Sequence, residues 1–218
     1  PNADRLGEHH TYDSGASRFA ASAESMTMSK PLISIGEAVH ASIPKTGRVM
    51  KQLADLGPDA YSTPSEPLDY IRSLIESQQA EGADYIAVNL DSFGEKNPQL
   101  AVDTMVEYVR LVRKWSGGIP VCIDSSDDNV LKAGLKEWYN TGDKVAQPLL
   151  NSVKTYTMDN ILPLKKEYDF AVVGLLVSED KPEGEGGSHS VDELYSLAKE
   201  IFAAAAGKYG FRPEEIFF

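Results

Sequence analysis

The fold is indicated most clearly by a stretch in the middle of the chain, VCIDSS at residues 121–126. Its apolar residues predict a short buried strand, and the acidic side chain of Asp124 follows directly after them. One unit later the segment LLNS has the same form, with Asn151 in the polar position. One unit earlier the segment IAVN ends on Asn89. Polar residues therefore recur at the ends of consecutive predicted strands.

The rest of the chain alternates short apolar strands with amphipathic helices. Strands are predicted at residues 32–35, 85–88, 119–123, 145–150, 170–177 and 216–218. Helices with apolar residues at helical spacing are predicted between them, through residues 68–78, 101–112, 130–135, 161–168 and 191–202. Strands that alternate with helices imply right-handed βαβ units and a parallel sheet.

Two parallel architectures are compatible with this order. An open doubly wound sheet would carry a glycine-rich phosphate turn after its first strand, but the chain contains no GxGxxG or GxxxxGK[ST] motif. Polar residues at several strand ends, with Glu37 after the first, favour a (β/α) barrel, whose sites gather at the C-terminal ends of the strands. Residues 1–30 are polar and lack periodicity, which predicts a flexible tail or an expression remnant ahead of a barrel at 31–218.

Charge and composition exclude several classes of protein. The chain has 33 Asp and Glu against 21 Lys and Arg, a net charge of −12 that repels phosphate backbones and argues against nucleic-acid binding. The single cysteine, Cys122, excludes a disulfide framework, fits a reducing cytoplasm, and is predicted to be a buried, inert thiol. No apolar run approaches the roughly 18 residues of a membrane helix, and no HxxxH or HxxE spacing suggests a metal site. We expect a cytoplasmic protein.

Hydrogen-bonding capacity suggests the class of ligand. The carboxylate of Asp124 can accept two parallel N–H bonds, which suits a heterocycle with an amino group beside a ring N–H. The pyrimidine edge of a pterin has this pattern, and guanine-like rings present a similar edge. The flanking amides of Asn89 and Asn151 can donate and accept at once. A structural alternative stays open, in which Asp124 caps the following helix and the two asparagines close turns.

Longer segments carry a resemblance to a known family. They are IGEAVHASIPKTG (35–47), AEGADYIAVNLDSFG (80–94), VCIDSSDDNVLKAGLK (121–136), LLNSV (149–153), VVGLLVSED (172–180) and GFRPEEIFF (210–218). The chain resembles the pterin-binding barrels, and within them the methyltetrahydrofolate:corrinoid/iron–sulfur protein methyltransferases. Dihydropteroate synthase shares this barrel, but its N-x-T-P-D-S-F loop is absent here. The resemblance implies a (β/α)8 TIM-barrel type fold, dihydropteroate synthase-like, of which this chain covers the first six strands.

The resemblance also implies a site and an activity. Asp124 and Asn151 would bind the pterin ring, and Asn89 would line the same mouth. The predicted enzyme is a methyltransferase that moves the N5 methyl group between methyltetrahydrofolate and the cobalt of a corrinoid protein. The implied substrate is methyltetrahydrofolate or tetrahydrofolate, with cobalamin carried by a partner protein, no bound metal, and a homodimer left open. The alternatives are a dihydropteroate synthase-type enzyme and a catalytically silent pterin-binding or assembly subunit.

The chain departs from the family in two places. The family has G-E-R-x-N after its first strand, whereas Ala38 and His40 replace the Arg and the Asn here. Glu37, His40 and Ser125 are therefore candidate rim residues. The family has eight strands, so we expect this sequence to be a fragment, and the Asn that contacts N5 in the family would lie beyond Phe218. The catalytic residue is left unassigned, and the Gly- and Glu-rich loop at 179–188 is predicted to be mobile over the mouth.

Overall fold

The structure is a computed structural model that describes residues 32–180 and 189–218. By their internal contacts, Ile33–Phe218 form one compact unit. The predicted tail at 1–30 and most of the loop predicted to be mobile at 179–188 lie outside the described residues.

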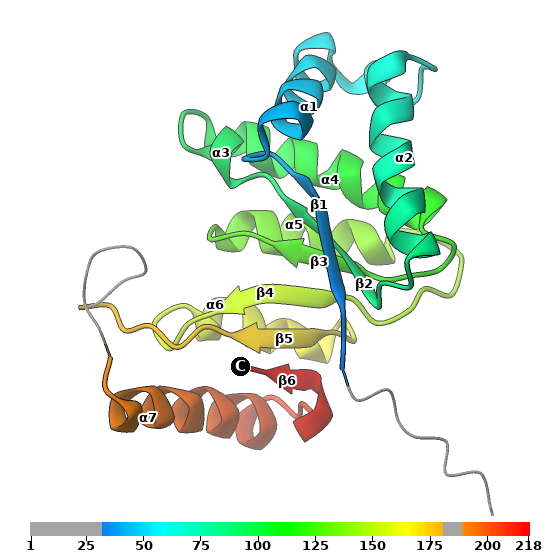
Figure 1. Ribbon diagram of the computed structural model, residues 1–218. Coiled ribbons are helices and arrows are strands. Elements are labelled where there is room, and N and C mark those ends of the chain that lie inside the picture. Colours follow the sequence, from blue (N-terminus) through cyan, green and yellow to red (C-terminus); the bar gives the residue numbers. More distant parts are fainter. Residues whose placement is uncertain (1–31, 181–188) are drawn as a thin grey trace, which may run out of the picture. The chain divides into compact units, whose positions relative to one another are not determined.

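A six-stranded parallel sheet forms the centre of this compact unit, with its strands in sequential order (Figure 1). The strands are β1 (Ile35–His40), β2 (Tyr85–Asn89), β3 (Val121–Asp124), β4 (Leu149–Val153), β5 (Ala171–Gly174) and β6 (Ile216–Phe217). Every neighbouring pair is parallel. Sequential parallel strands joined through helices are the pattern of the first six units of a (β/α)8 barrel. The predicted α/β fold class is confirmed.

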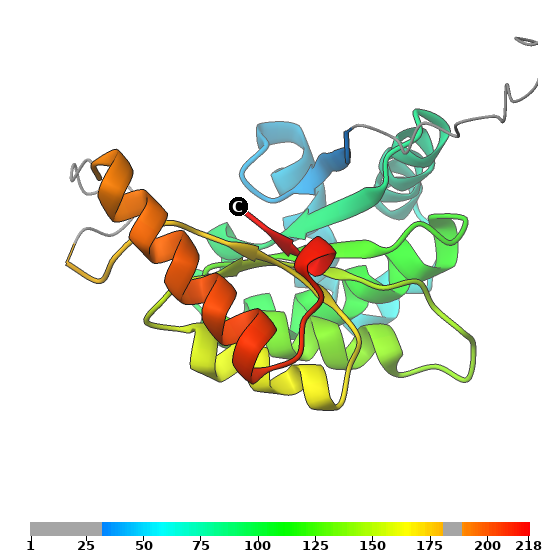
Figure 2. The ribbon, with the colours of Figure 1, turned by 90° about the horizontal axis from the view of Figure 1, so that it is seen from below.

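Helices connect the strands, and Figure 2 shows α5, α6 and α7 along the same side of the sheet. The helices are α1 (Pro44–Leu56), α2 (Glu66–Ala80), α3 (Asp91–Gly94), α4 (Pro98–Trp115), α5 (Asp128–Tyr139), α6 (Met158–Ile161) and α7 (Val191–Phe202). Shorter turns are the 3₁₀ segments η1 (Pro58–Tyr61), η2 (Leu162–Lys166) and η4 (Pro213–Glu215), and a π-helical segment η3 (Ala203–Lys208). No helix in the described part of the chain combines the length and the apolar character needed to cross a membrane.

Successive side chains of each strand point to opposite sides of the sheet, so the sheet has two different faces. One face packs against the helices in the main hydrophobic core, to which Ile86, Val88 and Ile123 belong. The opposite face carries a second, smaller apolar row, and the strand registers align its members. They are Ala87, Cys122, Leu149 and Ala171. Two residues further along each strand the next row of this inner face follows. It consists of Asn89, Asp124, Asn151 and Val173.

The first strand lies further along the chain than predicted. The apolar run at 32–35 predicted a strand that ends at Gly36, but β1 includes Gly36 and continues beyond it, because a bulge interrupts its pairing with β2. The Ala38 N–H in this bulge donates to Oε1 of the buried Gln78 on α2, at 2.9 Å. A Cβ at Gly36 would lie 2.4 Å from the same oxygen, so any larger residue there would displace the Gln78 side chain.

Prolines explain two further differences from the predicted elements. The strand predicted at 145–150 begins only after Pro148, because proline has no N–H to donate to a neighbouring strand. The helix predicted at 161–168 is divided between α6 and η2 at Pro163, which removes a helical hydrogen bond. The fifth strand is also shorter than predicted and ends at Gly174.

Candidate functional site

The polar residues predicted at the strand ends lie in one row at the C-terminal edge of the sheet. Asn89 is in register with Asp124, and Asp124 with Asn151. On the other side, His40 of β1 is in register with Asn89. Each of the three central residues follows a member of the inner apolar row by two positions, so its side chain lies on the same face of the sheet. The row therefore brings a carboxylate between two amides.

This row lines a cavity of about 390 Å³. The lining consists of Asn89, Asp91, Asp124, Ser125, Ser126, Asn151, Ser152, Lys154 and Leu175. The volume lies within the range of about 300–1,000 Å³ that is usual for small-molecule sites. Nearly all the lining residues are polar, so the cavity is suited to recognise a ligand by hydrogen bonds.

Asp124 lies half-buried at the centre of the row. Burial raises the pKa of its carboxyl group above the usual value, and the nearby carboxylates of Asp91 and Glu37 act in the same direction. Asn89, through a hydrogen bond, and His40, through its electrostatic interaction, lower the pKa without reversing the shift. Asp124 is therefore a partly desolvated acceptor that lies beside the Asn89 amide in the register row.

The structural alternative for Asp124 is wrong. The residue that caps α5 is Asp127, whose Oδ1 accepts a hydrogen bond from the Asn129 N–H at 2.8 Å. Asp124 is the last residue of β3, three positions earlier, and belongs to the sheet. The carboxylate of Asp124 is therefore not used to start a helix.

The two asparagines differ in how far the protein itself uses their side chains. Oδ1 of Asn89 accepts a hydrogen bond from the Asp91 N–H at 3.1 Å, so Asn89 does close a turn, as the alternative predicted. The amide group of Asn89 also lowers the pKa of the Asp124 carboxyl group. The Asn151 side chain makes no hydrogen bond to any described residue, and it lines the cavity. Asn151 therefore retains its full capacity to donate to and accept from a ligand.

Asp91 is a site residue that the sequence analysis did not predict. Its Oδ1 accepts from the Ser125 hydroxyl at 2.6 Å, and its Oδ2 from the Ser126 N–H at 2.9 Å. The same Ser125 hydroxyl accepts from the Asp127 N–H at 3.1 Å, and the Ser125 N–H donates to the Asn151 carbonyl at 2.9 Å. Ser125, predicted as a rim residue, is only 3% exposed, and it holds the loop after β3 in place. The sequence did contain a signal for Asp91, because this acidic residue lies two positions after Asn89, which ends a predicted strand.

The two candidate rim residues of β1 lie at different positions along the strand. Glu37 lies inside β1 and not after it, because the bulge lengthens the strand, so its predicted place after the first strand is corrected. His40 is the residue at the end of β1. Its Nδ1 accepts from the Ser42 N–H at 3.1 Å, so the proton of the neutral ring is on Nε2. His40 can therefore donate from Nε2 at the same edge as Asn89.

Cys122 lies below this row and is fully buried, as predicted. Burial raises the pKa of its thiol, and the charges of Asp124 and Glu37 add to this shift, so the reactive thiolate is disfavoured. Among the residues that the structure describes, no group of three or more His, Cys, Asp or Glu side chains is arranged to hold a metal ion.

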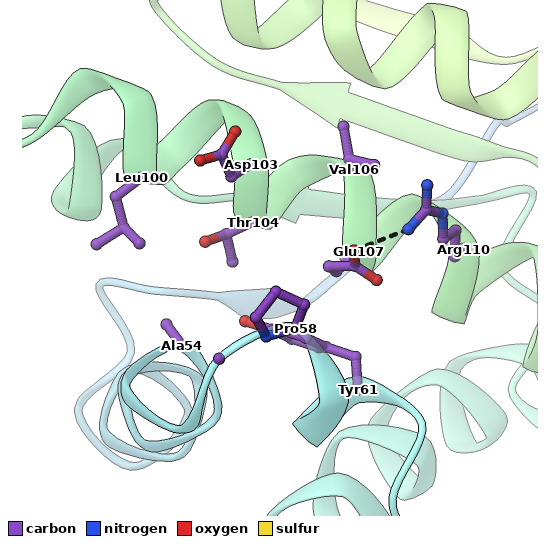
Figure 3. A pocket seen from close by; sticks show the side chains of 10 residues that line it. Ala54, Pro58, Tyr61, Leu100, Asp103, Thr104, Val106, Glu107 and Arg110 are labelled. Atoms are coloured by element: carbon purple, nitrogen blue, oxygen red, sulfur yellow. Dashed lines mark hydrogen bonds and ion pairs between the residues drawn. The ribbon is translucent and has the colours of Figure 1, made fainter.

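A second cavity, of about 380 Å³, lies between the α1–η1 segment and α4 (Figure 3). Its lining consists of Ala54, Gly57, Pro58, Tyr61, Leu100, Asp103, Thr104, Val106, Glu107 and Arg110. The guanidinium of Arg110 is engaged at 2.8 Å by Glu107 and at 2.8 Å by Glu137 of α5, so it links neighbouring helices. No member of the strand-end row lines this cavity. We therefore assign the functional site to the strand ends.

A parallel α/β sheet with a polar cavity at the C-terminal ends of its strands defines a barrel-type ligand-binding protein. The family model that matches the chain is described as pterin binding enzyme, and it matches residues 57–218. The chain belongs to this family of pterin-binding enzymes. Comparison with curated proteins gives no match. The matched segment contains every residue that lines the strand-end cavity and leaves β1, with His40, outside.

Proposed function

We propose that the protein moves the N5 methyl group between methyltetrahydrofolate and the cobalt of a corrinoid carried by a partner protein. The observation that supports the pterin part is the register row at the sheet edge. There the carboxylate of Asp124 lies between the amides of Asn89 and Asn151 and faces a cavity. Methyl transfer, the more specific part of the proposal, is supported by the sequence segments that resemble the methyltransferases of this family.

Recognition of the pterin ring would rest on Asp124. Its carboxylate accepts from the amino group and the neighbouring ring N–H, and the free amide of Asn151 pairs with a ring nitrogen or the carbonyl. Because Asp124 is partly removed from water, each of these hydrogen bonds is stronger than on an open surface. A hydrogen bond from the neighbouring Asn89 amide would hold the carboxylate in place, so less orientational freedom would be lost on binding.

Methyl transfer then depends on the position of N5 relative to cobalt and on a proton for the leaving nitrogen. The bond from N5 to the methyl carbon breaks, and a bond between that carbon and cobalt forms. The Co(I) centre of the partner would supply the electron pair for the new bond. The nitrogen that leaves keeps the pair of the broken bond and needs a proton or a hydrogen-bond donor. This chain's residues would hold the ring so that N5 faces the incoming corrinoid in line.

The first-strand loop favours methyl transfer over dihydropteroate synthesis. The chain has Gly-Glu-Ala-Val-His at residues 36–40, and it lacks the N-x-T-P-D-S-F loop that the synthases use. The corrinoid protein, the cytoplasmic location and the folate substrate all belong to this proposal.

The test is an anaerobic assay of the complete protein with methyltetrahydrofolate and cob(I)alamin, followed by the visible absorbance of the cobalt. We expect methyl transfer by the unaltered protein and by Asp143→Asn, which changes an exposed acid away from the cavity. We expect loss of transfer in Asp124→Asn. A parallel assay supplies a dihydropterin diphosphate and p-aminobenzoate. Diphosphate release there, without methyl transfer, would replace this proposal by dihydropteroate synthesis, and pterin binding with neither reaction would indicate a catalytically silent subunit.

A further inference from the structure

Lys154 carries the one cationic side chain among the residues that line the strand-end cavity, whereas Asp91 and Asp124 contribute negative charge. Lys154 follows β4 directly, three residues after Asn151. The cavity therefore combines an acidic part at the ends of β2 and β3 with a basic group beyond the end of β4.

The ammonium of Lys154 makes no ion pair with any residue that the structure describes. Other lysines of this chain do have carboxylate partners. Examples are Lys51 at 2.8 Å, Lys165 at 2.7 Å and Lys208 at 3.1 Å. The chain has an excess of acidic residues, 33 against 21 basic ones, so carboxylates are plentiful. Lys154 is thus a cation at the cavity that remains available to an anion from outside the chain.

A turn holds Lys154 beside an aromatic ring. The Lys154 N–H donates to the Thr157 hydroxyl at 3.2 Å, and the Lys154 carbonyl accepts from the Met158 N–H at 2.8 Å. Within this turn the Lys154 Nζ lies 5.9 Å from the ring centroid of Tyr156, which is 41% exposed. The backbone contacts fix the start of α6 and place a cation and an aromatic side chain next to each other beyond β4.

The two charged parts of the cavity are separate. Asp124 is in register with Asn151 of β4, and Lys154 follows Asn151 by three positions, past the end of that strand. Lys154 therefore lies beyond the register row that contains Asp124. A ligand that satisfies both parts needs N–H donors at one end and an anionic group at the other.

We infer that Lys154 and Tyr156 form a subsite for an acidic arm on the pterin ligand, so that the protein selects pterins that carry such an arm. The inference rests on the proposed pterin site at Asp124. An acidic arm can be an aminobenzoylglutamate, as in folates, or a diphosphate. The ring of Tyr156 favours the aminobenzoylglutamate, because an aromatic ring in the arm can pack against it while a terminal carboxylate meets the ammonium.

The experiment compares ligands that share the ring and differ in the arm. Calorimetric titration of the complete protein uses methyltetrahydrofolate, 6-methyltetrahydropterin, which has no acidic arm, and a dihydropterin diphosphate. The variants are Lys154→Gln, Lys154→Glu and Tyr156→Leu. The control is Lys144→Gln, which removes the same charge from an exposed position away from the cavity. Circular dichroism confirms that each variant is folded.

Lys154→Gln should weaken methyltetrahydrofolate binding by up to about fivefold, the upper limit for an exposed charge pair. Binding of 6-methyltetrahydropterin should not change. Lys154→Glu should weaken the folate further, and Tyr156→Leu should weaken it without affecting the arm-free pterin. The difference between the ligands should shrink at high salt, because ions screen an exposed pair. Lys144→Gln should bind all ligands as the unaltered protein does.

Each other outcome overturns a defined part of the account. An equal loss for both reduced pterins in Lys154→Gln would mean that Lys154 only shapes the loop, and unchanged binding of both would also remove the subsite. A loss confined to the diphosphate would keep the subsite but overturn its assignment to aminobenzoylglutamate. If the unaltered protein binds none of the three ligands, the proposed function itself fails, and the subsite fails with it.

Discussion

The carboxylate of Asp91 accepts a 2.6 Å hydrogen bond from the hydroxyl of Ser125, a residue 34 positions later in the chain. Its other oxygen accepts from the Ser126 N–H at 2.9 Å. These contacts join the segment after β2 to the loop after β3, immediately next to Asp124. The geometry of the candidate pterin-binding carboxylate therefore depends on Asp91, whose own oxygens are already used within the protein.

Asp91→Asn should loosen this connection and change the titration of Asp124. The new NH₂ group has to face either the Ser125 hydroxyl or the Ser126 N–H, so at least one hydrogen bond is weakened or lost. Removal of a hydrogen bond to a charged group costs about 1.5–3 kcal/mol of stability. Removal of the negative charge also lowers the pKa of Asp124, because Asp91 raises it. Thermal melting and the pH profile of pterin binding measure the two effects.

Glu95→Gln is the matched control, since it removes the same charge from an exposed position just after α3. It should leave both measurements unchanged. A melting temperature and pH profile for Asp91→Asn equal to those of Glu95→Gln would show that Asp91 does not position the site.

Pterin affinity should fall in acid at a pH higher than an ordinary aspartate would predict. Burial raises the pKa of Asp124 from 3.8, and only the ionised carboxylate can accept both N–H bonds of the ring. Affinity is therefore complete above the raised pKa and is lost as the pH falls through it. The pH dependence of folding stability has the opposite sign to that of ligand affinity. The folded state holds this proton more tightly than the unfolded state, so the contribution of Asp124 to stability decreases as pH rises from 3.8 through the folded pKa.

Calorimetric titration from pH 7 down to pH 4 measures the affinity profile. Asp124→Asn should lack the acid limb that the unaltered protein shows. An acid limb that persists unchanged in this variant would have to come from another group.

Glu215 should stabilise the opposite end of the sheet without affecting ligand binding. This carboxylate is 3% exposed and accepts from the Gln147 amide at 2.7 Å and the Arg212 N–H at 2.8 Å, with the Lys165 ammonium at 3.1 Å. These partners lower its pKa from 4.5 to about 2, against the effect of burial, which raises it. Its contribution to stability is complete above pH 4.5 and is lost as the pH falls toward 2.

Glu215→Gln should cost roughly 3 kcal/mol of unfolding free energy at pH 7, the low end for a disrupted buried ion pair. Denaturant unfolding at several pH values checks this. The difference between the variant and the unaltered protein should shrink toward pH 2, and a difference that stays constant with pH would contradict the assigned role.

Tyr108→Phe should raise stability. The Tyr108 side chain is fully buried on α4 and packs edge-to-face on Tyr61, with ring centroids 5.7 Å apart. Its hydroxyl has no hydrogen-bond partner among the described residues. A buried hydroxyl without a partner costs about 1–3 kcal/mol, so its removal should stabilise the fold by about 1 kcal/mol while the rings remain packed. Chemical denaturation measures the change, and a clear loss of stability would show that the hydroxyl has a partner, such as a buried water.

The central strands and their ends were predictable because their signals are local. Asn89, Asp124 and Asn151 each follow an apolar run within one βαβ unit, and parallel pairing necessarily brings such ends together. The first strand was not predictable in this way. Its bulge is stabilised by Gln78, which is 40 residues from Ala38 in sequence. The apolar pattern of a strand contains no information about such a partner.

The remaining site residues depend on loops rather than on periodicity. Asp91 acts through Ser125 across two different connections of the barrel, and Lys154 is placed by a turn that ends in a short helix. Ser125 was expected at the rim, but its hydroxyl is engaged on both sides and it is buried. Loop residues of this kind are recognised only once the strand ends are in place.

The most direct test of the central claim is calorimetric titration of methyltetrahydrofolate into the complete protein, Asp124→Asn and Asn151→Ala. Asp124→Asn replaces one of two acceptors by a donor, so one N–H of the ring meets an amide. It should cost about 1.5–3 kcal/mol, or roughly one to two decades in affinity. Asn151→Ala removes a neutral contact and should cost nearer 1 kcal/mol. Both variants should keep the circular dichroism spectrum of the unaltered protein, because each change lies at a strand end outside the main core. The account predicts a clear loss of affinity in folded Asp124→Asn protein, and unaltered affinity in that variant would contradict the assignment of this cavity to a pterin.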